Sequence, residues 1–180
     1  MIPFSKVTNS LEEIEDIFKS EKIEKIVLKP LDGMGGKSIF FIERGDKNLS
    51  VIWETISQMG RKHFIVQEYI EEAKHGDHRL VFINYQLLPR KVVRVPSHKD
   101  FRGNLAAGAT SKIEPVTKQD QEIASQIIPY LEENGIYFAG ADLLGGRLSE
   151  INITSPTCLQ EIHKNSDLDP AKVFWDNLKK

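Results

Sequence analysis

Residues 26–42 read IVLKPLDGMGGKSIFFI, and this stretch decides which kind of fold the chain adopts. Its two ends are short apolar runs of the kind that form buried strands. The segment between them is rich in glycine and shows no helical periodicity. The order strand, glycine loop, strand therefore predicts an antiparallel hairpin.

The glycine loop is a candidate phosphate-binding element. Gly33, Gly35 and Gly36 lack side chains, so backbone amides can approach an anion closely, and the Ser38 hydroxyl could add a donor. The loop is not a Walker A motif, because that motif requires an earlier glycine where this chain has Leu31, and a helix directly after the loop. From these residues alone, a glycine-rich turn without a ligand is an equally good interpretation.

Lys29 favours the phosphate interpretation. It lies at the end of the first strand, where its ammonium could point at phosphates lying under the loop. The alternative is a solvated surface lysine, which is the usual environment of this residue type.

The rest of the chain predicts an α+β fold with antiparallel sheets. Apolar residues at helical spacing predict helices over about 11–20 and 49–59, and a third begins at Thr117, with Asp120 in its first turn, and ends at Gly135. Strands are expected over 64–68, 78–83, 86–95, 137–144 and 147–151, the last two joined by Gly145-Gly146. Residues 96–111 are expected to form one long loop, and one or two short helices follow residue 154.

The expected hairpin at 137–151 carries candidate metal ligands. Strand side chains alternate, so Glu150 and Asn152 face the same way, and hairpin pairing can bring Asp142 beside them. Two carboxylates and an amide oxygen suit a Mg²⁺ ion that bridges nucleotide phosphates. Solvated carboxylates at strand ends are the alternative. We favour metal binding because Glu150 and Asn152 flank apolar residues on a strand expected to be central in its sheet.

Three arginines are candidates for charge stabilisation. Arg79 and Arg94 lie on expected strands and Arg102 lies in the long loop. Guanidinium groups suit carboxylates and transferring phosphoryl groups. Each arginine alone is more often structural, but three around one site favour a functional role. The segment 102–108, RGNLAAG, is expected to be a lid that closes over substrate, with an ordinary surface loop as the alternative.

Composition argues against several classes of protein, among them nucleic-acid-binding and membrane proteins. The formal net charge of −2 provides no basic field for nucleic acid or an anionic membrane. Cys158 is the single cysteine, so neither an intrachain disulfide nor a thiolate metal cluster can form. The first residues do not resemble a signal peptide and no apolar run reaches the ~18 residues of a membrane span. We expect a cytoplasmic protein that binds neither nucleic acid nor membrane.

Three segments resemble the ATP-grasp superfamily, and within it the bacterial glutathione synthetase family. They are LKPLDGMGG (28–36), RGNLAAG (102–108) and EINITSPTC (150–158), and the resemblance covers nearly the whole chain from about residue 5. It implies two α+β lobes that enclose ATP: a small lobe over 1–70 with the glycine-rich loop, and a larger lobe over 71–180 with the metal-binding hairpin and the lid. Family members also carry an N-terminal domain that this chain lacks, so a fragment, a split subunit and a truncated form all stay open.

The resemblance also implies a role for each candidate residue. ATP would be held by Lys29, Gly33, Gly35, Gly36 and Ser38, by Gln67, Glu68, Tyr69 and Ile70 near adenine through backbone groups, and by Asp77 on the ribose or substrate side. Asp142, Glu150 and Asn152 would hold Mg²⁺, with Mn²⁺ as an alternative. Arg79, Arg94 and Arg102 would be catalytic, and Asn104 and Ser155 would lie near the peptide or glycine.

The implied reaction is ATP-dependent formation of a carbon–nitrogen bond. The family phosphorylates the cysteinyl carboxylate of γ-glutamylcysteine, and the amine of glycine attacks the acyl phosphate to give glutathione. Such catalysis depends on positioning and charge neutralisation, in agreement with the lack of a recognisable nucleophile here. The alternatives are another ATP-grasp carboxylate–amine ligase and a truncated, non-catalytic nucleotide-binding module. Small-molecule substrates are the expected partners, and a homo-oligomer or a separate N-terminal domain stays open.

Overall fold

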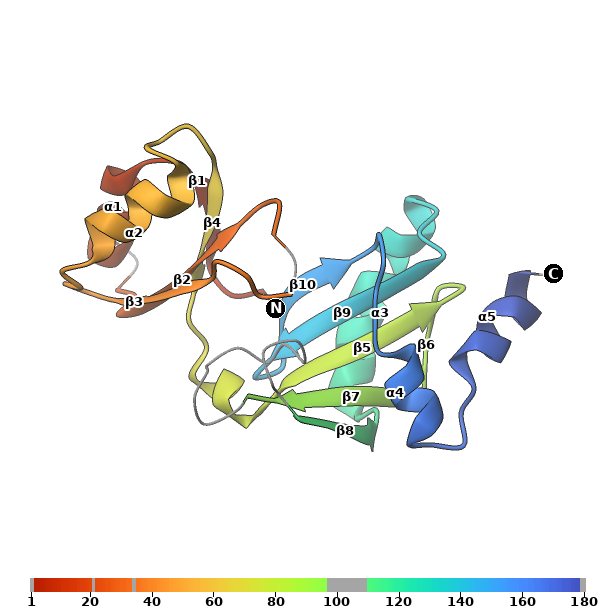
Figure 1. The fold of residues 1–180 in the computed structure, drawn as a ribbon. Coiled ribbons are helices and arrows are strands. Elements are labelled where there is room, and N and C mark those ends of the chain that lie inside the picture. The colour runs from red at the N-terminus through yellow and green to blue at the C-terminus, as the bar shows by residue number, and fades with distance from the viewer. Residues whose placement is uncertain (1, 21, 34, 97–109, 179–180) are drawn as a thin grey trace. The chain divides into compact units, whose positions relative to one another are not determined.

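A computed structural model describes residues 2–20, 22–33, 35–96 and 110–178 of the chain. These residues divide into two units, Ile2–Ile70 and the residues from Glu71 onward. Each unit has an antiparallel sheet of its own (Figure 1).

The first unit is a four-stranded sheet with two helices. Its elements are β1 (Ser5–Thr8), α1 (Leu11–Ser20), β2 (Lys25–Pro30), β3 (Phe40–Glu43), α2 (Leu49–Ser57) and β4 (Phe64–Glu68). The strand order is β1-β4-β2-β3. The expected hairpin around the glycine loop is confirmed, because β2 and β3 pair antiparallel with Ile26 opposite Ile42 and Leu28 opposite Phe40.

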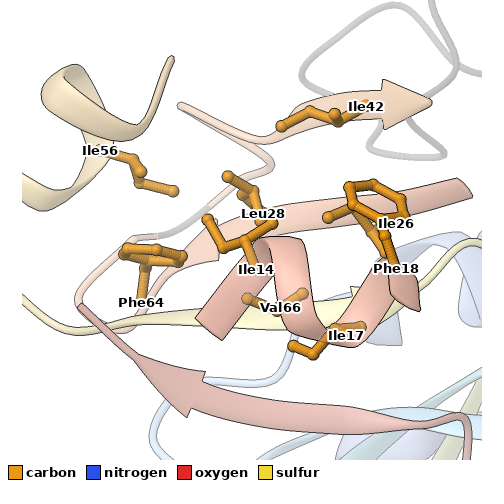
Figure 2. Packing of buried hydrophobic residues seen from close by; sticks show 9 residues of the cluster. All are labelled: Ile14, Ile17, Phe18, Ile26, Leu28, Ile42, Ile56, Phe64 and Val66. Carbon is orange, nitrogen blue, oxygen red and sulfur yellow. The ribbon is translucent and has the colours of Figure 1, made fainter. Parts of the chain in front are cut away.

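One face of this sheet forms a core with both helices. Side chains from α1, α2 and alternate positions of β2, β3 and β4 pack together, as Figure 2 shows. Ile26 and Leu28 are fully buried there, and their neighbours Val27 and Lys29 point to the opposite face because strand side chains alternate. The core therefore occupies one side and leaves Lys29 on the other.

The helix expected over 49–59 is shorter than the apolar pattern suggested. Gln58 adopts a left-handed conformation with φ of 49° and follows the last helical residue, Ser57. Met59 also has positive φ, and its amide donates to the carbonyl of Glu54, which closes the helix.

The second unit contains the larger sheet. Its elements are η1 (Glu71–His75, a 3₁₀ helix), β5 (Asp77–Ile83), β6 (Gln86–Leu87), β7 (Arg90–Val95), β8 (Thr110–Pro115), α3 (Lys118–Glu133), β9 (Phe138–Leu144), β10 (Arg147–Asn152), α4 (Leu159–Lys164) and α5 (Pro170–Leu178). The strand order is β10-β9-β5-β7-β8, and β6 pairs with β5. The α+β class with antiparallel sheets is confirmed.

The two faces of this sheet are covered differently. Leu80 and Phe82 of β5 pack with α3 on one face, whereas Val81 and Ile83 pack with α4 and neighbouring residues on the other (Figure 1). The second apolar cluster draws only on the Val81–Ile83 end of β5, so the start of β5 is left for polar side chains.

The first turn of helix α3 is capped and is also hydrogen-bonded to the sheet. Thr117 and Asp120 form the expected cap, each side chain accepting from the other residue's amide. The same Asp120 carboxylate accepts a 2.7 Å hydrogen bond from the buried Lys91 Nζ. Lys91 Nζ also lies 3.2 Å from His78 Nδ1, which must be the neutral acceptor because an ammonium only donates.

Three expectations for this unit were wrong. The strand expected over 86–95 is two strands, β6 and β7, separated at Leu88-Pro89, because proline has no amide to donate to a ladder. Thr110 and Ser111 begin β8 and do not belong to a loop; β8 is mostly exposed, so it lacks the alternation that marks a strand. The strand carrying Glu150 is an edge strand, because β10 pairs with β9 alone.

None of the helices within the described ranges has the length and apolar character needed to cross a membrane.

Candidate functional site

Four charged side chains gather on one face of the larger sheet. The register places Asp77 of β5 opposite Arg94 of β7, and Arg79 of β5 opposite Asp142 of β9. Because residues two apart on a strand share a face, these pairs form one cluster at the start of β5. The side chains are almost completely buried, from 5% exposed for each arginine to 15% for Asp77.

Asp142 is the centre of this cluster. Arg79 donates to both of its oxygens, from Nε to Oδ1 and from Nη2 to Oδ2 at 2.7 Å. Arg94 Nη2 lies 2.9 Å from Asp142 Oδ1 and also donates to Asp77 Oδ2. The two guanidinium groups and two carboxylates therefore balance in charge, which is the condition for burying four ions.

Burial and neighbouring charges within the cluster shift the pKa values of Asp77 and Arg94. Burial, with the nearby charge of Asp142, raises the pKa of Asp77 to about 6, although Arg94 opposes the shift. Burial would lower the pKa of Arg94, but the charges of Asp142 and Asp77 outweigh it, so the pKa is raised and the guanidinium stays charged. Among the described residues, Asp77 Oδ1 and Arg94 Nε are buried without a hydrogen-bond partner. These two atoms are positions where a ligand or water could complete the site.

The expected metal ligands lie beside the cluster. Glu150 is directly opposite Asp142 across β9 and β10, and the register shifts by one residue just before it. Asn152 Nδ2 lies 3.3 Å from Asp142 Oδ2, and Glu150 is exposed. Two carboxylates and an amide on one face fit a hard cation. Both Asp142 oxygens are already bonded to arginine, so a metal would compete with Arg79 and Arg94 for them.

Within the ranges that the structure describes, no group of three or more His, Cys, Asp or Glu side chains is arranged to hold a metal. The metal assignment thus depends on the mixed set of Asp142, Glu150 and Asn152, and it stays a prediction.

Lys29 is part of a polar chain on the other unit. Its Nζ donates to Gln67 Oε1 at 2.7 Å, and Gln67 Nε2 donates to Ser5 Oγ at 3.0 Å. The three residues come from β2, β4 and β1, on the face opposite the helices. Sequence reasoning treated Gln67 as a backbone contact only, and the structure shows its side chain holding the lysine.

The residues after Gln67 use their amides within the sheet. Glu68 donates to the Phe4 carbonyl and Tyr69 donates to the Lys25 carbonyl. The Tyr69 ring contacts Phe41 edge to face at 4.8 Å. Ile70 is buried. Backbone contact with adenine would therefore depend on groups other than these two amides.

The glycine loop has the backbone that its glycines suggested. Gly35 and Gly36 have φ of 66° and 74°, which glycine adopts without strain. A Cβ on Gly35 would have no neighbour within 4 Å, whereas one on Gly33 would lie 2.7 Å from Pro30 Cγ. Ser38 has φ of 56°, a strained value for a residue with a side chain.

The remaining candidates are Arg102, Asn104, the lid segment and Ser155. Arg102, Asn104 and the lid segment lie outside the described residues. Ser155 is exposed in the connection between β10 and α4. The structure adds Gly140, which lies against the side chain of Arg79 and has Pro156 as a further neighbour, and sequence reasoning missed this position. The available signal was a glycine in the interior of a strand.

A family model matches most of the chain. The model of the ATP-grasp domain of prokaryotic glutathione synthetase matches residues 1–167.

The chain belongs to this family.

The resemblance seen in the three sequence segments is confirmed by individual relatives of the glutathione synthetase family. Glutathione synthetase of Escherichia coli K12 is 43% identical over 176 residues, which are 98% of this chain and 55% of the relative. Glutathione synthetase of Vibrio cholerae is 37% identical over all 180 residues, or 56% of the relative. The chain thus spans about half the length of the curated relatives it matches.

Solved structures show the same ATP-grasp fold. D-cycloserine synthetase DcsG has a TM-score of 0.76 at 16% identity, covering 98% of this chain and 64% of that one. The ATP-grasp ligase PsnB with its minimal precursor has a TM-score of 0.71 at 21% identity, covering 98% and 54%. At these identities the likeness shows the fold alone, and the ATP-grasp architecture expected from sequence is confirmed.

Proposed function

We propose that this chain is the ATP-binding, catalytic part of a glutathione synthetase, which ligates γ-glutamylcysteine to glycine. The observation that carries the proposal is the cluster of Arg79 and Arg94 on Asp142, with Glu150 and Asn152 alongside. The guanidinium groups of the cluster are suited to an anionic substrate, and the exposed carboxylate of Glu150 is suited to a cation. The 43% identity to a glutathione synthetase over 98% of the chain supports the choice of substrates.

The proposed chemistry has two steps. A carboxylate oxygen of γ-glutamylcysteine attacks the γ-phosphorus of ATP, which releases ADP and leaves an acyl phosphate. The amine of glycine then attacks the acyl carbon, loses a proton and displaces inorganic phosphate. Neither step requires a protein nucleophile, so catalysis depends on orientation and on stabilising charge.

Different residues of the chain would bind ATP, stabilise charge and contact the substrate. Lys29, oriented by Gln67, would bind a phosphate of ATP under the loop of Gly33, Gly35, Gly36 and Ser38. Arg79 and Arg94 would stabilise the negative charge of the phosphoryl group and of the tetrahedral species. Asp77 would contact the ribose or substrate, and Ser155 the peptide or glycine.

The metal would be held by Asp142, Glu150 and Asn152, with Mg²⁺ expected and Mn²⁺ as an alternative. When bound, a divalent cation neutralises phosphate charge and lowers the barrier to attack. The edge position of β10 suits this role, because it leaves Glu150 exposed and able to reach a bound ion. The cytoplasmic location expected from the sequence stays a prediction.

A second candidate is a nucleotide-binding module without turnover. The observation that favours it is that both oxygens of Asp142 are already bonded to Arg79 and Arg94, so a metal would have to displace an arginine to bind there. A third candidate is another ATP-grasp ligase, which differs from glutathione synthetase in the substrates it requires.

Calorimetry with Mg-ATP and an ADP-release assay separate these candidates. The proposal expects binding, and continued release of ADP over many turnovers only when γ-glutamylcysteine and glycine are both present. Binding without turnover would support the module. Turnover with glutamate or D-alanine as the required substrate would support another ligase, and the lack of any nucleotide binding would contradict all three.

A matched pair of variants tests the metal set. Glu150→Gln should weaken Mg-ATP binding by about tenfold or more while leaving the melting temperature unchanged. Glu114→Gln removes the same charge from an exposed position on β8, at the other edge of the same sheet, and should leave binding unchanged. Equal affinities for the two variants would show that Glu150 is not a metal ligand.

A further inference from the structure

Gly140 lies in the interior of β9, two residues before Asp142 and on the same face. It is opposite Asn152 of β10 and Val81 of β5. Glycine weakens a strand by losing more backbone freedom on folding than other residues. Its presence here therefore requires a reason.

The reason is not the backbone conformation. Gly140 is absent from the glycines with positive φ, so its φ and ψ are accessible to any residue. In contrast, Gly135 has φ of 64°, and a Cβ there would have no neighbour within 4 Å. Glycine at position 135 allows a positive φ, whereas glycine at position 140 leaves room for neighbouring side chains.

That space is filled by the side chain of Arg79. A Cβ on Gly140 would lie 3.0 Å from Arg79 Cδ and 3.1 Å from Arg79 Nη1. It would also lie 3.1 Å from the Cβ of Pro156, which follows β10. The arginine thus passes closely over Gly140, with Pro156 as a further neighbour of the same position.

The neighbours cannot easily move away. Arg79 is 4% exposed and its Nε and Nη2 are both committed to Asp142, a geometry that requires the planar guanidinium to align with the carboxylate. Pro156 is buried and its ring is rigid. A methyl group at position 140 would therefore displace the guanidinium by a few tenths of an ångström and disturb its paired contact with Asp142.

We propose that Gly140 is a positioning residue for the ligase reaction: by lacking a side chain, it sets the place and plane of the Arg79 guanidinium. This inference rests on the proposed function for its kinetic consequence, but its structural consequence is independent of it. Gly140→Ala should disturb Arg79 and leave the nucleotide contacts of Lys29 and the glycine loop intact. The expected kinetic result is a loss of kcat of about tenfold with little change in the KM for ATP, because misplacing a charge-stabilising group by ~1 Å can cost a hundredfold.

The first test observes Arg79 directly. In a ¹H–¹⁵N spectrum, the Arg79 Nε–H signal is assigned by its loss in Arg79→Lys. It should shift or broaden in Gly140→Ala and stay unchanged in Gly135→Ala, which serves as the control for adding a methyl group to the same unit. Gly135→Ala should lower the melting temperature because of its positive φ. An unchanged Arg79 signal in Gly140→Ala would overturn the proposal.

The second test asks whether Gly140 acts through Arg79. The kcat of Gly140→Ala, Arg79→Lys and the double variant is measured at saturating substrates. The loss caused by Gly140→Ala should be much smaller in the Arg79→Lys background, because the group it displaces is no longer present. Full multiplication of the two losses would overturn the proposal. If the unsubstituted chain shows no turnover, the proposed function fails, and the ¹⁵N signal alone decides the positioning of Arg79.

Discussion

Removing the charge of Asp142 is expected to destabilise the second unit strongly. Asp142→Asn keeps the size of the side chain but leaves Arg79 and Arg94 with Asp77 as the remaining carboxylate of the cluster. Two buried cations then share one anion. The new amide also directs a donor group at a guanidinium, which can only donate.

The magnitude follows from the burial of the pair. Asp142 and the two arginines are 8%, 5% and 5% exposed, so solvent cannot compensate for the missing charge. Removing one partner of a buried ion pair costs about 3–5 kcal/mol, because the other charge is left uncompensated. The double variant Arg79→Met/Asp142→Leu removes both charges and should cost much less, since an apolar pair of similar volume is often neutral.

The assay is urea denaturation combined with amide hydrogen exchange. Exchange of the Leu80 and Ala141 amides reports on β5 and β9, because these two residues are opposite each other and next to the Arg79–Asp142 pair. Asp176→Asn is the control, because it breaks the exposed Lys172–Asp176 pair of α5 and should leave the urea midpoint almost unchanged. A loss below about 1 kcal/mol for Asp142→Asn would refute the reasoning, because it would mean that the cluster is effectively solvated.

Three further predictions use other parts of the chain. Burial, followed by the charge of Lys91, lowers the pKa of His78. The stability gained from the neutral His78 and its contact with Lys91 is therefore fully present above about pH 6.5, and it is lost as the pH falls through the lowered folded-state pKa. The drop in urea midpoint between pH 7.5 and pH 5 should therefore be smaller in His78→Gln, and equal drops would contradict this. Thr117→Ala removes the cap of α3 and should cost about 1 kcal/mol in thermal denaturation, so an unchanged melting temperature would count against the capping role. Lys29→Met should weaken ATP binding in calorimetry, whereas Lys47→Met, at an exposed turn, should not; equal affinities would exclude Lys29 from the phosphate site.

Local features of the fold could be predicted well from the sequence. The hairpin around the glycine loop, the turn at Gly145-Gly146 and the cap at Thr117 depend on residues a few positions apart, so their signals lie within one short window. The same holds for the three segments that identified the family. Strand β8 was missed because its exposed side chains carry no apolar alternation, and β10 was misplaced because strand order depends on partners elsewhere in the chain.

For the candidate site too, local features were predictable from the sequence and contacts between distant strands were not. The sequence by itself determined which residue types were available: a lysine before a glycine loop, three arginines, and two carboxylates with an amide on one hairpin. Only the tertiary structure decided that Arg79 and Arg94 bind Asp142, and that Gln67 holds Lys29, because these contacts join strands separated by dozens of residues. It also revealed that Gly140 makes room for Arg79. The physical reason is that backbone patterns are read from near neighbours, whereas the neighbours of a side chain in a sheet are set by the register of pairing with distant strands.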